Sequence, residues 1–125
     1  MSLADISVDD SEQLSRMVLF DNHVRKEAGN LKPVAFLPYS RVELSVIRQR
    51  NLSIEDLWRI GFQVAELRQR PLIGRGDIAA IVAKIAPLNV IPKEGDGLPK
   101  NHADIIGWPA DKPAQMLLAA ELVSG

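Results

Sequence analysis

The sequence has no cysteine and only two histidines among its 125 residues. The lack of cysteine excludes disulfide bridges, thiolate metal sites and cysteine nucleophiles, and it fits a reducing compartment. No apolar run approaches the roughly 20 residues that a membrane-spanning helix needs. Residues 1–3 show neither a basic region nor an apolar stretch of a signal peptide. We therefore expect a cytoplasmic protein without a membrane partner.

Net charge is also nearly absent, at −1, so the total charge favours neither nucleic acid nor an anionic membrane surface as a partner. Charge is nevertheless uneven, because residues 41–75 carry seven arginines against four acids. The hydrophobic fraction of 46% and the charged fraction of 25% are typical of a globular protein. We expect one domain over residues 1–125, with residues 1–10 loosely ordered.

The periodicity of apolar residues predicts an α+β fold. The predicted elements are a helix from 11 to about 23, strands at 34–37 and 43–49, a helix at 54–69, a turn at 74–77, a helix at 78–86, strands at 88–91 and 103–107, and a helix opened by Asp111. Paired strands between helices favour a small mixed or antiparallel sheet of about four strands packed by about four helices.

The helix at 54–69 has the clearest signals. Ser53 precedes an acidic first turn, as in a capping box. Apolar residues then recur three and four positions apart, and Pro71 ends the pattern.

The segment from Asn101 to Pro109 holds the main candidate site. His102 and Asp104 would share one face of a strand, where they could form an acid–base couple. They could equally be a buried histidine and a carboxylate that satisfies a loop amide. A metal site needs three or four ligands, and the other histidine, His23, lies far along the chain, so no metal is expected.

Trp108 follows in the same segment and could stack on a ligand ring or a partner side chain. It could instead close the core over the last helix. Arg75 and Asp77 lie in Gly-Arg-Gly-Asp, which we interpret as a turn able to bind an anion before a helix N-terminus. The pattern lacks the spacing of a phosphate loop or a dinucleotide fingerprint, so an ordinary turn stays the alternative.

The arginine-rich segment suggests a further candidate. Arg48, Arg59 and Arg68 could contact nucleic acid, and helices 54–69 and 78–86 could form a helix-turn-helix. The connection between those helices is longer than the usual turn of three or four residues. Local acids can also pair with these arginines, which then form a solvated face.

Four short motifs resemble a group of short bacterial proteins of unknown function. They are AFLP at 35–38, ELSV at 43–46, GRGDI at 74–78 and HADIIGWP at 102–109. The likeness covers roughly residues 33–122. It implies a bacterial origin and an accessory role, and it carries over no activity, fold or catalytic residue.

We conclude from the sequence that the chain is a binding module without catalysis, which takes an unidentified protein or a small anionic ligand. Its site would lie where His102, Asp104 and Trp108 meet the turn at 74–77, with Arg75 and Asp77 as ligand-binding residues. The main alternative is a small hydrolase or transferase that uses His102 and Asp104, with Arg75 holding an anionic group. Nucleic-acid binding is a third interpretation. No cofactor is expected, and a homodimer is left open.

Overall fold

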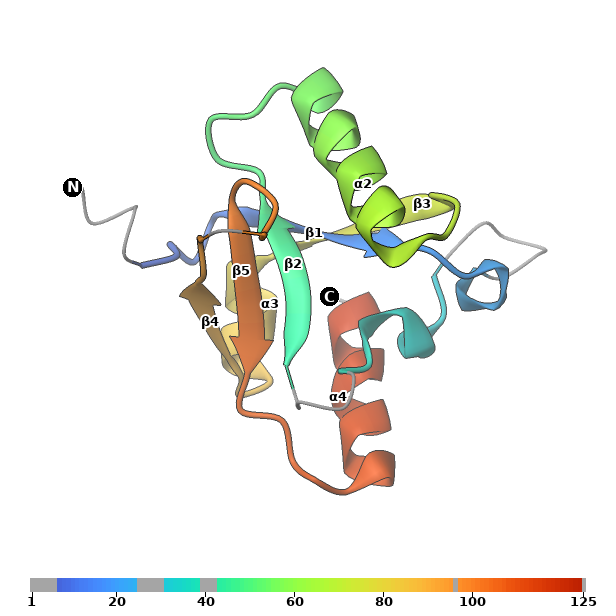
Figure 1. Ribbon diagram of the computed structural model, residues 1–125. Coiled ribbons are helices and arrows are strands. Elements are labelled where there is room, and N and C mark those ends of the chain that lie inside the picture. The colour runs from blue at the N-terminus through green and yellow to red at the C-terminus, as the bar shows by residue number, and fades with distance from the viewer. Residues whose placement is uncertain (1–6, 25–30, 39–42, 96, 125) are drawn as a thin grey trace.

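The computed structural model describes residues 7–24, 31–38, 43–95 and 97–124, and its centre is one antiparallel sheet (Figure 1). The strand order is β3-β1-β2-β5-β4. The strands are β1 Gln13–Val18, β2 Leu44–Arg48, β3 Gly74–Ala79, β4 Asn89–Pro92 and β5 His102–Ile106. The predicted α+β class is confirmed, with five strands where about four were predicted.

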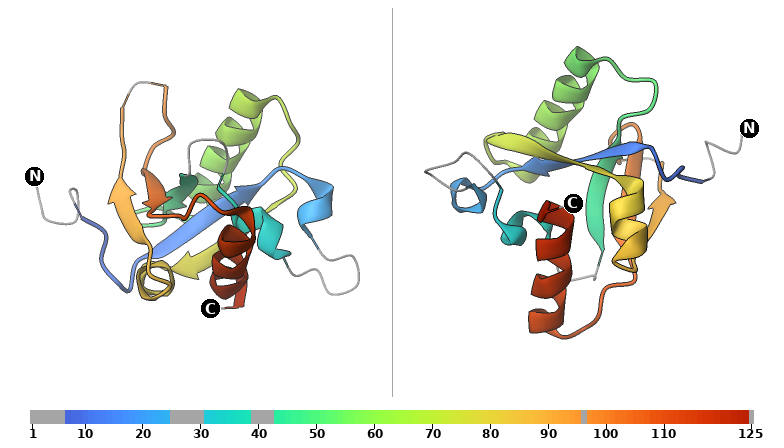
Figure 2. Two further views of the ribbon diagram at one scale, coloured as in Figure 1. Left: turned by 90° about the horizontal axis from the view of Figure 1, so that it is seen from below. Right: turned by 180° about the vertical axis from the view of Figure 1, so that it is seen from behind.

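Three α-helices and two short 3₁₀ helices accompany the sheet in the described residues. They are α2 Ile54–Arg68, α3 Ala80–Ile85, α4 Lys112–Ser124, η1 Asp21–His23 and η2 Pro33–Phe36. Figure 2 shows α2 and α4 on opposite sides of the sheet. The sheet is therefore the middle layer of the molecule.

The two faces of the sheet bury separate apolar clusters. The larger cluster joins the sheet to α3, α4 and η2, and it includes Leu14, Val18, Phe36, Ile105 and Leu122. The smaller cluster lies under α2 and consists of Met17, Ile47, Leu57 and Ile60.

The predicted helix at 11–23 is wrong, because residues 13–18 form the strand β1. Leu14 and Val18 enter the larger cluster, whereas Met17 enters the smaller one on the opposite face. A strand buried on both faces shows no clean alternation of apolar and polar residues. Its apolar residues fell by coincidence at the three-and-four spacing of a helix.

The predicted strand at 34–37 is also wrong. Pro33 opens the 3₁₀ helix η2, and Phe36 is buried beneath the sheet. Pro33 fixes φ at a value suited to the first position of a helical turn, and it cannot donate to a strand ladder.

The predicted turn at 74–77 is in fact part of the edge strand β3, so the helix after it begins later, at Ala80, without a cap from Asp77 or Gly76. Gly76 is required for space and not for turn geometry. A Cβ atom there would lie 2.2 Å from Cδ1 of Leu31 and 3.0 Å from Cζ of Phe36.

The other predicted elements are confirmed within a few residues. Ser53 caps α2 by accepting a hydrogen bond from the backbone N–H of Asp56 at 3.1 Å. Asp111 likewise accepts one from the N–H of Ala114 and opens α4. Strands β2, β4 and β5 match the apolar runs predicted at 43–49, 88–91 and 103–107.

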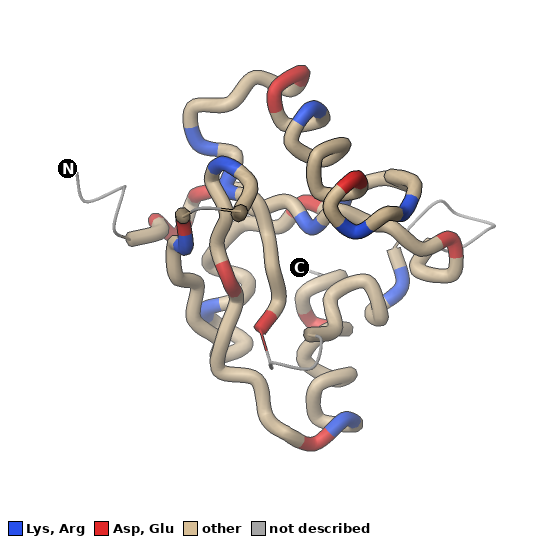
Figure 3. The backbone as a smooth tube through the Cα atoms, viewed as in Figure 1, with Lys and Arg blue, Asp and Glu red and all other residues tan. Residues whose placement is uncertain are grey.

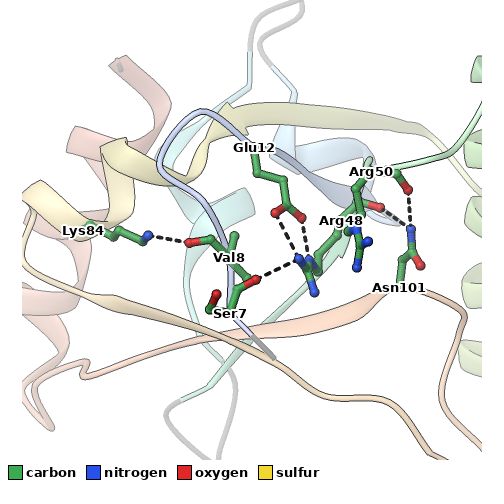
Figure 4. A network of polar contacts seen from close by, with 7 residues as sticks. All are labelled: Ser7, Val8, Glu12, Arg48, Arg50, Lys84 and Asn101. Atoms are coloured by element: carbon green, nitrogen blue, oxygen red, sulfur yellow. Dashed lines mark hydrogen bonds and ion pairs between the residues drawn. The ribbon is translucent and has the colours of Figure 1, made fainter. Parts of the chain in front are cut away.

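Figure 4 shows how the segment before β1 is attached to the sheet. Arg48 forms a bidentate ion pair with Glu12 and also donates to the carbonyl of Ser7 at 3.0 Å. Lys84 of α3 donates to the carbonyl of Val8, which is itself buried. Residues 1–6, which belong to the segment predicted to be loosely ordered, lie outside the described residues.

Candidate functional site

The candidate site lies where β1 and β2 separate. The two strands pair only at Leu14 with Arg48 and at Ser15 with Ile47, and they diverge beyond that point. Arg16 crosses the gap and donates to the carbonyl oxygens of Ala35 and Ser45, at 3.2 and 3.0 Å. The bond to Ser45 satisfies a carbonyl group of β2 that a paired neighbouring strand would otherwise serve.

A pocket of about 370 Å³ opens beside this gap, between the sheet and the C-terminal half of α2. That volume is within the range of small-molecule sites. Side chains or backbone of three regions line it: the strands, α2 with the residues just after it, and the loops at 19–23 and 97–99. The lining residues are Ser15, Arg16, Met17, Leu19, Phe20, His23, Ser45, Val46, Ile47, Val64, Leu67, Arg68, Arg70, Gly97, Leu98, Pro99 and His102.

The lining of the pocket combines apolar and basic residues. Five of the described lining residues are basic, namely Arg16, His23, Arg68, Arg70 and His102, and none is Asp or Glu. Arg70 stacks its guanidinium on the ring of Phe20, 4.0 Å from the centroid, and donates to the carbonyl of Leu19. Three arginines beside an apolar floor suit an anion with an apolar body.

His23 lines one end of the pocket and lies close to two other basic residues. Partial burial lowers its pKa below the usual 6.5, and the charges of Arg16 and Lys32 lower it further. The ring of His23 also contacts that of Phe20, with 5.0 Å between centroids.

His102 and Asp104 share one face of β5, as the sequence predicted. Nε2 of His102 lies 3.6 Å from Oδ1 of Asp104, and Nδ1 lies 3.1 Å from the carbonyl oxygen of Lys93. A carbonyl only accepts, so Nδ1 is the donor in that bond. Asp104 is almost fully buried and is also approached by Ser45 and by Lys93.

The same contacts bear on the acid–base couple that the sequence suggested for His102 and Asp104. A general base must direct a free ring nitrogen at the substrate. Nδ1 of His102 is bonded to Lys93, whereas Nε2 lies 3.6 Å from Asp104, beyond hydrogen-bond distance. His102 is 6% exposed and forms part of the pocket wall.

The predicted meeting of His102 with Arg75 and Asp77 is wrong. Across the sheet, His102 lies opposite Ile47, Ile47 opposite Ser15, and Ser15 opposite Asp77. Three strand spacings therefore separate β5 from β3, about 14 Å at the usual 4.8 Å per step. The enzyme interpretation needed these residues to face each other across a cleft.

Arg75 and Asp77 contact each other instead. Nε of Arg75 donates to both carboxylate oxygens of Asp77, at 3.1 and 3.2 Å. The guanidinium lies over the ring of Trp58 in α2, and Ser15 donates to Asp77 at 2.6 Å.

Trp108 lies on the other side of the sheet from His102. It belongs to the larger core cluster, and its Nε1 donates to the carbonyl of Ile105 at 2.9 Å. Gly107 has φ +95° and turns the chain so that Trp108 enters the core. The predicted role of Trp108 as a ligand-stacking residue is therefore not supported, because its ring is buried.

The three nucleic-acid candidates have different surroundings. Arg48 is buried against Glu12, Arg59 is exposed and paired with Asp56, and Arg68 borders the pocket. Strand β3 lies between α2 and α3, so these helices do not form a helix-turn-helix. Figure 3 shows Lys and Arg spread over several elements and not gathered on one helix.

Sequence reasoning missed most of the pocket. Ser15, Phe20 and His23 fell in a segment predicted to be a helix, and Leu98 in a loop that carried no signal. Of the candidate residues named from the sequence, His102 and Arg68 line the pocket, although neither was predicted to belong to it.

Comparison of the chain with protein-family models, curated proteins and solved structures finds no match. Among the described residues, no group of three or more His, Asp or Glu side chains is arranged to hold a metal ion. None of the described helices is both long and apolar enough to cross a bilayer.

Proposed function

We propose that this domain binds a small carboxylic acid with an apolar body in the pocket beneath α2, without chemical turnover. The observation that carries the proposal is the lining, in which five basic residues and no described acidic residue surround an apolar floor. Met17, Ile47 and Leu67 supply part of that floor.

A carboxylate is favoured because the strongest cations in the pocket are arginines. The planar guanidinium matches the two oxygens of a carboxylate better than the ammonium of lysine does. Val64 and Leu98 offer contacts to a hydrocarbon chain. Binding without turnover is favoured because His102 and Asp104 are both almost fully buried.

Calorimetric titration with octanoate, octan-1-ol and octylamine tests the proposal, because the three probes share a chain and differ in head group. Octanoate is expected to bind and to raise the melting temperature, octanol to bind at least tenfold more weakly, and octylamine not to bind. Equal binding of all three would show an apolar cavity without charge selection and would contradict the proposal.

Variants locate the binding site. Arg70→Gln is expected to weaken octanoate binding by tenfold or more, since one charged hydrogen bond contributes about 1.5–3 kcal/mol. Arg59→Gln is the matched control, because Arg59 is an exposed arginine of α2 outside the pocket lining. Octanoate binding that is unchanged in Arg70→Gln would place the anion elsewhere.

A further inference from the structure

The edge strand β3 has features of a surface for a second copy of this chain. Among the described residues, its one sheet neighbour is β1 (Figure 2). It has six residues without proline or lysine, whereas the opposite edge, β4, has four and ends at Pro92. Proteins usually protect edge strands by proline, by short length or by charged side chains, lysine above all. Strand β3 has no proline or lysine and is not short, and its two charged residues, Arg75 and Asp77, have opposite signs.

The register of β3 shows which of its backbone groups point outward. The N–H of Ala80 donates to the carbonyl of Glu12, in line with the β1–β3 pairing. Hydrogen-bonded pairs alternate along antiparallel strands. Gly74, Gly76 and Ile78 therefore direct their backbone groups to β1. Arg75 and Asp77 direct theirs away from the sheet.

We propose that two copies of the chain associate by antiparallel pairing of β3 about a twofold axis at Gly76. This alignment places Arg75 opposite the partner's Asp77, and Asp77 opposite the partner's Arg75. All of these residues have outward backbone groups, so each opposed pair exchanges two hydrogen bonds. The opposed side chains have opposite charges, which favours this register over neighbouring ones.

The surroundings of Arg75 bear on the same partner. Nη1 of Arg75 is buried and has no hydrogen-bond partner among the described residues. This atom is covered within the chain, so the partner is inferred from the exposed edge of β3 and its charges and not from Nη1. Phe62 lies one helical turn from Trp58, the residue that covers Arg75, and is 62% exposed. If a partner strand extends the sheet past β3, it adds surface next to the exposed side of α2 that carries Phe62.

Sedimentation equilibrium of the whole chain over about 5–500 µM tests the proposal, since interfaces of small area give weak dimers. The wild type is expected to dimerise reversibly within this range. In Arg75→Asp positions 75 and 77 both carry carboxylates, and in Asp77→Arg both carry guanidinium groups. Each single variant alone is expected to lose dimerisation by at least tenfold.

The decisive measurement mixes these two variants. Across the mixed interface every carboxylate faces a guanidinium, so a heterodimer is expected from two chains that do not dimerise alone. The double variant Arg75→Asp with Asp77→Arg is expected to dimerise like the wild type. A monomeric wild type at all concentrations, or a mixture that stays monomeric, would overturn the proposal.

Two further variants separate the interface from folding. Lys100→Asp makes the same change of charge as Arg75→Asp next to β5, away from β3, and should leave dimerisation unchanged. Asp77→Asn keeps a hydrogen-bond acceptor for Ser15 and removes the charge. It should weaken the dimer several-fold without a change in circular dichroism, and full-strength dimerisation in Asp77→Asn would count against the charge pairing.

Discussion

Arg48 and Arg59 belong to the same arginine-rich segment, yet their surroundings are opposite. The Arg48 side chain is 4% exposed and bound to Glu12, whereas that of Arg59 is 69% exposed beside Asp56. Residue type alone does not distinguish a structural cation from a surface one. The position of each residue relative to the sheet makes the difference, because only Arg48 lies on a strand.

Substitution of Arg48 should destabilise the fold strongly. Arg48→Ala leaves the carboxylate of Glu12 buried without its partner, which costs about 3–5 kcal/mol. Arg59→Ala should change the free energy of unfolding by less than about 0.5 kcal/mol. Urea unfolding of both variants checks this expectation. A double variant, Arg48→Met with Glu12→Leu, should recover most of the loss, and equal losses in single and double variants would contradict the ion-pair explanation.

His23 should make stability depend on pH. Burial and the charges of Arg16 and Lys32 lower its pKa in the folded state below the 6.5 of the unfolded chain. Between these two pKa values the unfolded chain binds more protons, so the stability that neutral His23 allows is present above pH 6.5. It is lost as the pH falls through the folded-state pKa.

Unfolding measured from pH 7.5 to 5 in the wild type and in His23→Gln isolates this contribution. The free energy of unfolding of the wild type, relative to that of His23→Gln, should decrease as the pH is lowered from 7.5 to 5. A difference that stays constant over this range would contradict the role of His23. NMR titration of His23 adds a second readout, since a bound carboxylate should raise its pKa toward the usual value.

At the scale of elements, β3 contains two nearby glycines, and only one of them is required by the packing around it. A Cβ at Gly76 would collide with Leu31 and press on Phe36, whereas one at Gly74 would meet nothing within 4 Å. Neither glycine has positive φ. The pair was therefore misread as a turn, although one of the two serves close packing against η2.

Alanine substitutions at these two positions should differ. Gly76→Ala should destabilise the fold by about 1–3 kcal/mol through overpacking. Gly74→Ala should be neutral or slightly stabilising, since alanine restricts the unfolded chain. Thermal unfolding of both variants is the measurement, and a larger loss in Gly74→Ala would contradict the packing argument.

Helix α2, with one exposed face, was predicted correctly from the sequence, whereas β1, which is buried on both faces, was not. Helix α2 has one buried face and one exposed face, so its period is visible in the sequence. Strand β1 is covered on both faces, which removes the period on which such prediction rests. The proline-flanked run at 34–37 was short and apolar, and such runs fit a strand or a helical turn equally well.

At the scale of the whole molecule, the pocket depends on the divergence of β1 from β2. That divergence brings Ser15, Ser45 and His102 to the same floor and leaves room beneath Arg68 and Arg70. Octanoate binding that is weakened in Arg70→Gln would show that the strands and the end of α2 form one binding site. The dimer proposed through β3 uses another edge of the same sheet and stands independently of the pocket.

The sequence by itself determined the α+β class, the absence of cysteine chemistry, the bounds of α2, the start of α4, and the shared face of His102 and Asp104. These properties depend on neighbours within a few positions, where propensity, capping and the two-residue repeat of a strand act. Only the tertiary structure decided that Arg75 lies three strands from His102, that Trp108 is part of the core, and that basic residues distant along the chain line one pocket. Strand order is set by contacts between residues distant along the chain, and local patterns do not encode it.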